Sequence, residues 1–232
     1  MADSQPFSIT KVLAGLGGAL LITSFFLPLL DTSQPAARDG FGISDLRRQI
    51  EKTRDAELVR PLIEPAMQEL ERFATTPSLK NLTGVAGATR ELLDTAASLG
   101  TAEAAEMRQV AGMLGWLRIG LWLLPLVGLV QLAIPAVTRF RGYTGLLGLV
   151  GRFFFGWLFI LMALVPIAGA PDAQRALIGP AIWALLVGAG LMMVAGLFGV
   201  TRRNWWAVLL ADATIIGATV FAIKAFADAM RG

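Results

Sequence analysis

The first long apolar stretch of the chain reads VLAGLGGALLITSFFLPLL, from Val12 to Leu30, and it contains no charged residue. At a helical rise of 1.5 Å per residue, about 20 apolar residues cross the roughly 30 Å hydrocarbon core of a bilayer. Four further apolar stretches follow: Met113–Val137, Leu146–Ala170, Ala176–Val200 and Trp205–Phe226. The sequence therefore predicts an all-α integral membrane protein with five transmembrane helices.

One long polar segment, Asp31–Gly112, separates the first apolar stretch from the second. It holds 13 of the 17 Asp and Glu residues and ten of the 20 Lys and Arg residues, as an ordinary water-exposed domain would. The rest of the chain is basic. We expect a short N-terminal segment with the first transmembrane helix in residues 1–30, a helical domain in residues 31–112, and a four-helix transmembrane domain in residues 113–232.

The basic residues of the short loops predict the orientation. Lys and Arg that flank a transmembrane helix stay in the cytoplasm, whereas long loops cross the membrane whatever their charge. Lys11, Arg139, Arg141, Arg202 and Arg203 all fall on one side of five alternating crossings. This pattern predicts a multi-pass protein of the bacterial inner (cytoplasmic) membrane, with a cytoplasmic N-terminus. Residues 31–112, as a cap, and the C-terminus would be extracytoplasmic.

Apolar residues three and four apart predict that the cap is helical. Ser44 or Asp45 could cap its first helix, and Pro61 and Pro65 predict a kink or a break in it because proline removes a helical hydrogen bond. A second helix is expected over Leu79–Leu99, ended by Gly100. A third begins near Thr101 and could run without a break into the second apolar stretch.

Charged residues inside the apolar stretches are costly in hydrocarbon and are the best candidates for a site. Asp212 lies seven residues after Trp205, and Arg152 lies at a similar depth in its own stretch. We expect the two to form a buried charge pair, with a proton or ion relay as the alternative role. Arg118 and Lys224 lie near the outer interface, where long basic side chains can reach water or headgroups.

Small residues at helical spacing predict faces at which membrane helices approach closely. The expected helix-packing interface lies on the fourth and fifth stretches and consists of Ala184, Gly188, Ala195, Gly199, Ala211 and Ala218.

The residue types argue against several functions. The chain has neither His nor Cys, and it lacks a nucleophile motif and a phosphate-binding loop. We therefore expect no enzyme activity, no catalytic residue, no metal and no cofactor. No run of Lys or Arg is interleaved with aromatic residues, so nucleic acid is not an expected partner.

The expected partners are the lipid bilayer and other membrane protein subunits, or further copies of the chain. The main hypothesis is a non-catalytic accessory or scaffolding subunit of a larger bacterial inner-membrane assembly, which docks through its helical cap and its small-residue faces. One alternative is a small transport or channel component that uses Asp212 and Arg152. Another is a periplasmic ligand sensor.

Overall fold

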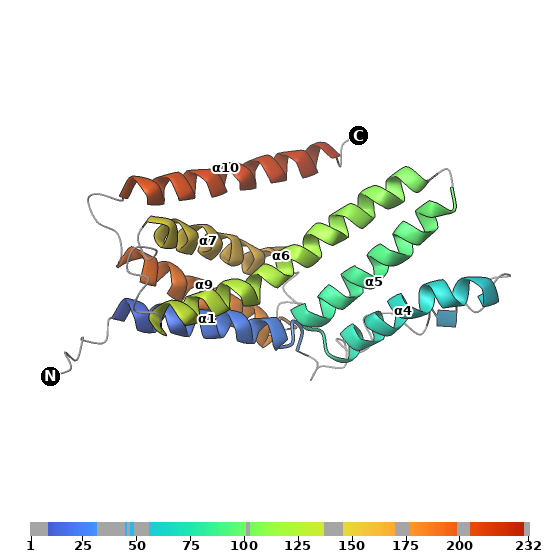
Figure 1. Cartoon of the computed structure of the whole chain (residues 1–232), viewed down its shortest axis with the longest axis horizontal. Helices are drawn as coiled ribbons and strands as arrows, with labels where there is room; N and C mark the ends of the chain where they lie inside the picture. The colour runs from blue at the N-terminus through green and yellow to red at the C-terminus, as the bar shows by residue number, and fades with distance from the viewer. Residues whose placement is uncertain are drawn as a thin grey trace. The chain divides into compact units, whose positions relative to one another are not determined.

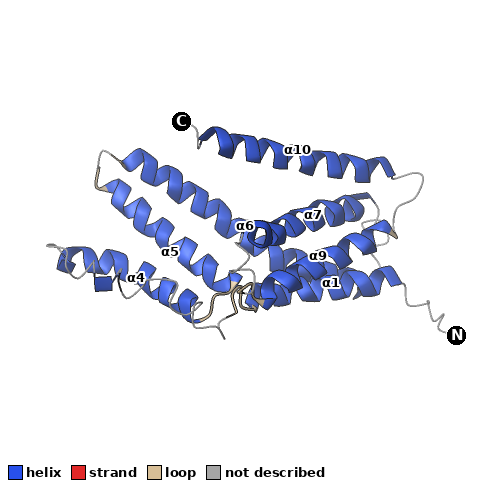
Figure 2. Cartoon of the chain, turned by 180° about the vertical axis from the view of Figure 1, so that it is seen from behind, coloured by secondary structure: helices blue, strands red, loops and turns tan. Residues whose placement is uncertain are grey.

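The computed structural model describes residues 9–31, 45, 47–48, 56–100, 103–136, 146–169, 177–198 and 205–229. Within these ranges the regular elements are all helices and none is a strand (Figure 2). Figure 1 labels them. They are α1 (Ile9–Phe26), α4 (Ala56–Thr75), α5 (Leu79–Ser98), α6 (Ala104–Ala136), α7 (Leu146–Gly169), α9 (Pro180–Leu197) and α10 (Trp205–Ala229).

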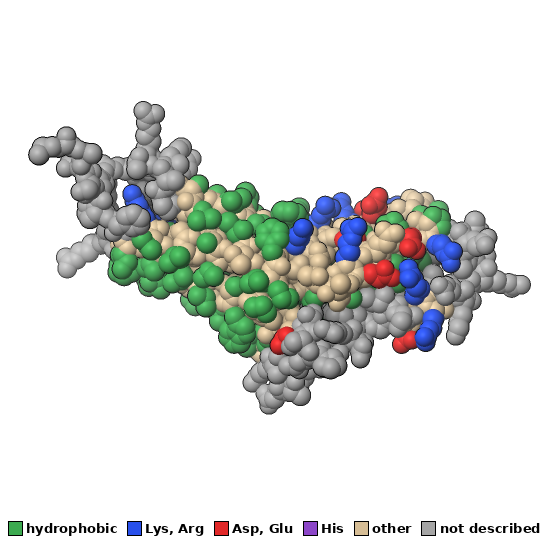
Figure 3. Space-filling view, turned by 90° about the horizontal axis from the view of Figure 1, so that it is seen from below, with side chains coloured by type: hydrophobic (Ala, Val, Ile, Leu, Met, Phe, Trp, Pro, Cys, Tyr) green, Lys and Arg blue, Asp and Glu red, His purple; other side chains and the backbone are tan. Residues whose placement is uncertain are grey.

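Three of these helices contain segments long and apolar enough to cross a membrane: Ile9–Phe26, Ala104–Ala133 and Pro180–Leu197. Two shorter apolar segments, Gly148–Leu164 and Trp205–Val220, belong to α7 and α10. The visible surface divides into a hydrophobic stretch and a stretch where Lys, Arg, Asp and Glu side chains gather (Figure 3). The chain is thus an all-helical protein with helices suited to a membrane.

The chain divides into two compact units. Unit 1 comprises Met1–Ile22, Pro125–Gly169 and Trp183–Gly232, and unit 2 comprises Thr23–Leu124 and Ala170–Ile182. The sequence-based boundaries after residues 30 and 112 refer to the membrane surface, and they stay predictions.

In unit 2, α4 and α5 pack against each other as a helical hairpin. The sequence predicted a kink or a break at Pro61 and Pro65, and a break is wrong, since α4 runs through both prolines from Ala56 to Thr75. Both prolines are exposed. Water can therefore solvate the carbonyl groups that lose a backbone donor, which lowers the cost of keeping the helix. Of the two predicted caps of the first helix, Ser44 lies outside the described residues, and Asp45 is itself helical.

The predicted second helix of the cap is confirmed to within one residue, because α5 spans Leu79–Ser98. Ser78 caps its start, with the side-chain oxygen accepting from the Asn81 backbone N–H at 3.2 Å. Gly100 follows its end with φ of +74°, a conformation that favours glycine. The next helix, α6, is continuous over 33 residues, which confirms that the third predicted helix runs into the second apolar stretch.

The residues after α1 connect three segments of unit 2. The backbone N–H of Leu29 donates to the carbonyl of Pro77, and the N–H of Asp31 donates to that of Leu177. Gly179 donates in turn to the Leu29 carbonyl at 2.7 Å. The turn between α4 and α5 and the start of α9 are therefore both fixed to the end of α1.

Candidate functional site

Two buried or half-buried polar contacts join the helices of unit 1. Arg152 on α7 and Gln131 on α6 are each only 6% exposed, and Arg152 Nε donates to Gln131 Oε1 at 3.2 Å. Trp157 on α7 donates through Nε1 to Oδ1 of Asp212 on α10 at 2.8 Å. Each contact gives a charged side chain a neutral partner on another helix, which offsets part of the cost of removing the charge from water.

These contacts differ from the direct Arg152–Asp212 pair that the sequence predicted. Both residues lie on helices of unit 1, but Arg152 is hydrogen-bonded to Gln131 and Asp212 is hydrogen-bonded to Trp157. Depth along a helix does not determine which neighbouring helix a side chain meets, because that depends on the rotation of each helix about its own axis. A relay through either residue stays a prediction.

Glycines bring the backbones of unit 1 together. A Cβ atom added at Gly17 of α1 would lie 2.8 Å from the carbonyl oxygen of Gly188 of α9. One added at Gly18 would lie 2.6 Å from the carbonyl oxygen of Gly128 of α6. Because neighbouring helical residues point about 100° apart, the two adjacent glycines open two faces of α1, one toward α9 and one toward α6.

Similar contacts join α7 to its neighbours. Gly196 of α9 faces the ring of Phe153, with 3.0 Å between an added Cβ atom and Cε2. Phe153 also belongs to a buried apolar cluster between α7 and α10 that includes Val208 and Ala211. The helix α7 therefore packs on α9 through the contact of Phe153 with Gly196, and on α10 through apolar side chains.

The predicted helix-packing residues have different environments. Gly188 lies in the close contact with α1, Ala195 is fully buried, and Ala211 is buried between α7 and α10. Ala184 is half-buried and Ala218 is exposed. Gly199 lies outside the described residues. A role for these residues in contacts with other subunits stays a prediction.

Sequence reasoning missed the glycines of α1 and α6. It searched the fourth and fifth apolar stretches for small residues at helical spacing, but Ala14 and Gly18 show the same small-xxx-small spacing in the first. Both are buried. The adjacent pair Gly17 and Gly18 was a further signal of close packing. Because neighbouring residues of a helix point in different directions, such a pair indicates contacts on two faces.

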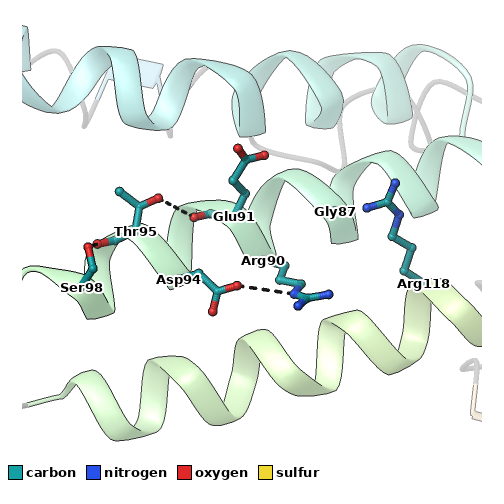
Figure 4. A pocket seen from close by; sticks show the side chains of 7 residues that line it. All are labelled: Gly87, Arg90, Glu91, Asp94, Thr95, Ser98 and Arg118. Carbon is teal, nitrogen blue, oxygen red and sulfur yellow. Dashed lines mark hydrogen bonds and ion pairs between the residues drawn. The ribbon is translucent and has the colours of Figure 1, made fainter.

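Unit 2 carries a second group of charged residues, where α5 and α6 are bridged by arginine side chains. The groove there has a volume of about 460 Å³, and its lining includes Arg90, Asp94 and Arg118 (Figure 4). Arg90 Nε lies 3.5 Å from Asp94 Oδ2. Within the described part of the chain, no three His, Cys, Asp or Glu side chains are grouped so that they could hold a metal ion.

Comparison with protein-family models, with curated proteins and with solved structures finds no match to this chain.

Proposed function

We propose that this chain is a non-catalytic accessory or scaffolding subunit of a larger protein assembly in the bacterial inner membrane. In this proposal all five apolar helices cross the bilayer, and residues 31–112 form an extracytoplasmic cap. The observation that carries it is the way the charged residues of the apolar helices are held. Arg152 and Asp212 each bind a neutral side chain of a neighbouring helix, as structural residues do.

The glycine contacts support a rigid bundle. A transporter must change the packing of its helices to alternate access between the two sides. In unit 1, α1 meets α9 through Gly17 and Gly188, and it meets α6 through Gly18 and Gly128. Such backbone contacts are lost when helices slide or rotate by even a small amount. A fixed framework that presents surfaces to other subunits fits this packing better than a moving one.

The cap supports a docking role. Its α4 helix carries charged side chains in exposed ion pairs, such as Arg47 with Glu64 and Glu71 at 3.7 and 3.3 Å. Exposed pairs of this kind add little stability. They do give the surface a pattern of charge that a partner can match, and charge complementarity of this sort determines partner choice more than affinity.

The first test is a mild-detergent purification of the native protein, with mass spectrometry of the intact particle. We expect foreign subunits in fixed stoichiometry with this chain. A particle made only of copies of this chain would contradict the accessory role. In that case, proton or ion flux into vesicles that is lost in the Asp212→Asn variant would establish the transport alternative.

The proposed orientation has its own test, because the chain has no cysteine of its own. Single cysteines replace two exposed residues, Leu99 in the cap and Ile9 before the first apolar stretch, so that the basic residues of the loops are kept. In intact spheroplasts a membrane-impermeant maleimide should label Leu99→Cys but not Ile9→Cys. Both should react after the membrane is opened. The reverse labelling would overturn the orientation without affecting the helical fold.

A further inference from the structure

The groove between α5 and α6 brings two arginines of unit 2 close together. Figure 4 shows Arg90 extending from α5 toward α6 and Arg118 extending from α6 toward α5, near Gly87. Glu91 also belongs to the groove lining, but its side chain points toward α4, away from the arginines (Figure 4). The carboxylate directed into the same space as the arginines is that of Asp94.

Each arginine lies over a glycine of the opposite helix. A Cβ atom added at Gly87 of α5 would lie 3.1 Å from Arg118 Nη1, and one added at Gly115 of α6 would lie 2.9 Å from Arg90 Nη1. The two contacts are three residues apart on each helix, which corresponds to about 4.5 Å of helical rise. The guanidinium groups thus lie against opposite helices, so a group that enters the groove meets a donor from each side.

The charges in this space do not balance. Arg90 forms an ion pair with Asp94 at 3.5 Å, while Arg118 has no carboxylate partner among the described residues. The described side chains thus bring two positive charges and one negative charge to the groove. The groove thus offers a site for an anion. Guanidinium groups suit phosphate best, because their paired N–H donors match its oxygens.

The position of Arg118 points to the source of that anion. The 18 residues after it, Ile119–Ala136, are apolar except for Gln131, and at 1.5 Å each they extend about 27 Å. Arg118 therefore lies near the start of the second apolar stretch, Met113–Val137, where a long basic side chain can reach the headgroup level. Trp116 is 76% exposed and Trp122 is 48% exposed, and they lie on either side of it in sequence. Exposed tryptophans are enriched at the level of lipid headgroups.

We propose that Arg118 and Arg90 bind the phosphate of a phospholipid headgroup in the outer leaflet. The inference rests on the proposed membrane placement of α6 and is independent of the accessory role. Gly87 and Gly115 contribute by leaving space for the guanidinium groups against the opposite helix. Asp94 orients Arg90 and limits the site to about one additional negative charge.

The test is native mass spectrometry of the full chain in detergent, titrated with palmitoyl-oleoyl phosphatidylglycerol. Arg118→Gln should weaken lipid binding at least about tenfold, as expected for the loss of a charge-assisted hydrogen bond. Arg118→Lys keeps the charge but loses the paired donors. Its lipid affinity should therefore lie between that of Arg118→Gln and that of the unchanged protein. The matched control is Arg108→Gln, an exposed arginine ten residues earlier on the same helix, which should bind the lipid as the unchanged protein does.

Two further ligands separate the sources of phosphate. Glycerol 3-phosphate should compete poorly, because it lacks the acyl chains that hold a lipid at this depth. Equal competition by glycerol 3-phosphate would identify a soluble phosphate compound and overturn the lipid assignment. Equal binding of diacylglycerol, or unchanged lipid affinity in Arg118→Gln, would overturn the phosphate site itself.

If Arg118→Gln fails to fold, as judged by circular dichroism, Arg118→Lys decides the question. Membrane fractionation tests the placement of α6 separately.

Discussion

Gly17 of α1 and Gly188 of α9 lie in mutual backbone contact. A Cβ atom added at Gly17 would lie 2.8 Å from the carbonyl oxygen of Gly188, and one added at Gly188 would lie 3.1 Å from that of Gly17. Both obstacles are backbone atoms, so no side-chain rotation can make room. Within a bilayer the hydrophobic effect does not drive helices together, and close packing of this kind takes its place. We therefore expect this contact to contribute measurably to the stability of the protein.

Gly17→Ala should destabilise the protein by about 1–3 kcal/mol, since the methyl group forces α1 and α9 apart. The matched control is Gly15→Ala on the same helix, where an added Cβ atom meets nothing within 4 Å. That variant should be neutral, or more stable by up to about 1 kcal/mol, because alanine favours helix over glycine. Unfolding in mixed detergent and SDS, followed by circular dichroism, measures both. Equal effects of the two substitutions would show that the contact carries no stability.

The hydrogen bond between Arg152 and Gln131 should appear as coupling between the two residues. Gln131→Leu removes the acceptor and leaves a buried guanidinium group with one partner fewer, while Arg152→Met removes the charge. The double variant should be more stable than the sum of the single effects predicts, by about 0.5–2 kcal/mol. The same SDS unfolding assay measures all three variants. Strictly additive effects would mean that the contact does not stabilise the native state.

Asp212 should tolerate Asn better than Leu. The Asn side chain keeps an oxygen that can accept from Trp157 Nε1, whereas Leu leaves that indole N–H without its acceptor. We expect Asp212→Leu to cost about 0.5–1.5 kcal/mol and Asp212→Asn to cost less. Thermal unfolding in detergent is the measurement, and Trp157→Phe is the control. In the Trp157→Phe background the difference between Asn and Leu should shrink, and an unchanged difference would assign it to another contact.

Ser78 should contribute to the stability of the cap as the N-cap of α5. Its side-chain oxygen accepts from the Asn81 backbone N–H, and the residue is 3% exposed. Ser78→Ala should cost about 1 kcal/mol. Ser98→Ala, at an exposed position near the other end of α5, should change stability by no more than about 0.5 kcal/mol. Thermal unfolding of the full chain followed by circular dichroism compares the two, and an equal loss from both would argue against the cap.

The sequence was a good guide to which residues are helical. The pattern of apolar residues in the cap predicted α5 to within one residue. It also predicted a third helix that could continue into the second apolar stretch, as α6 does. Of the kink or break predicted at Pro61 and Pro65, the break was wrong, because α4 is continuous there. Proline removes one hydrogen bond locally, but on an exposed helix face water can replace it, and burial is not visible in a local sequence rule.

The sequence by itself determined what lies along each helix: the apolar length, the positions of Arg152 and Asp212 along their helices, and the small residues that permit close approach. Only the tertiary structure decided which helices meet. Arg152 reaches Gln131, Asp212 accepts from Trp157, and Gly17 and Gly18 face different helices. The physical reason is that each apolar helix carries hydrophobic and small residues on all of its faces. Composition therefore does not determine how the helix is rotated about its own axis. Rotation is fixed by the fit between backbones and by the few polar groups that must find a partner.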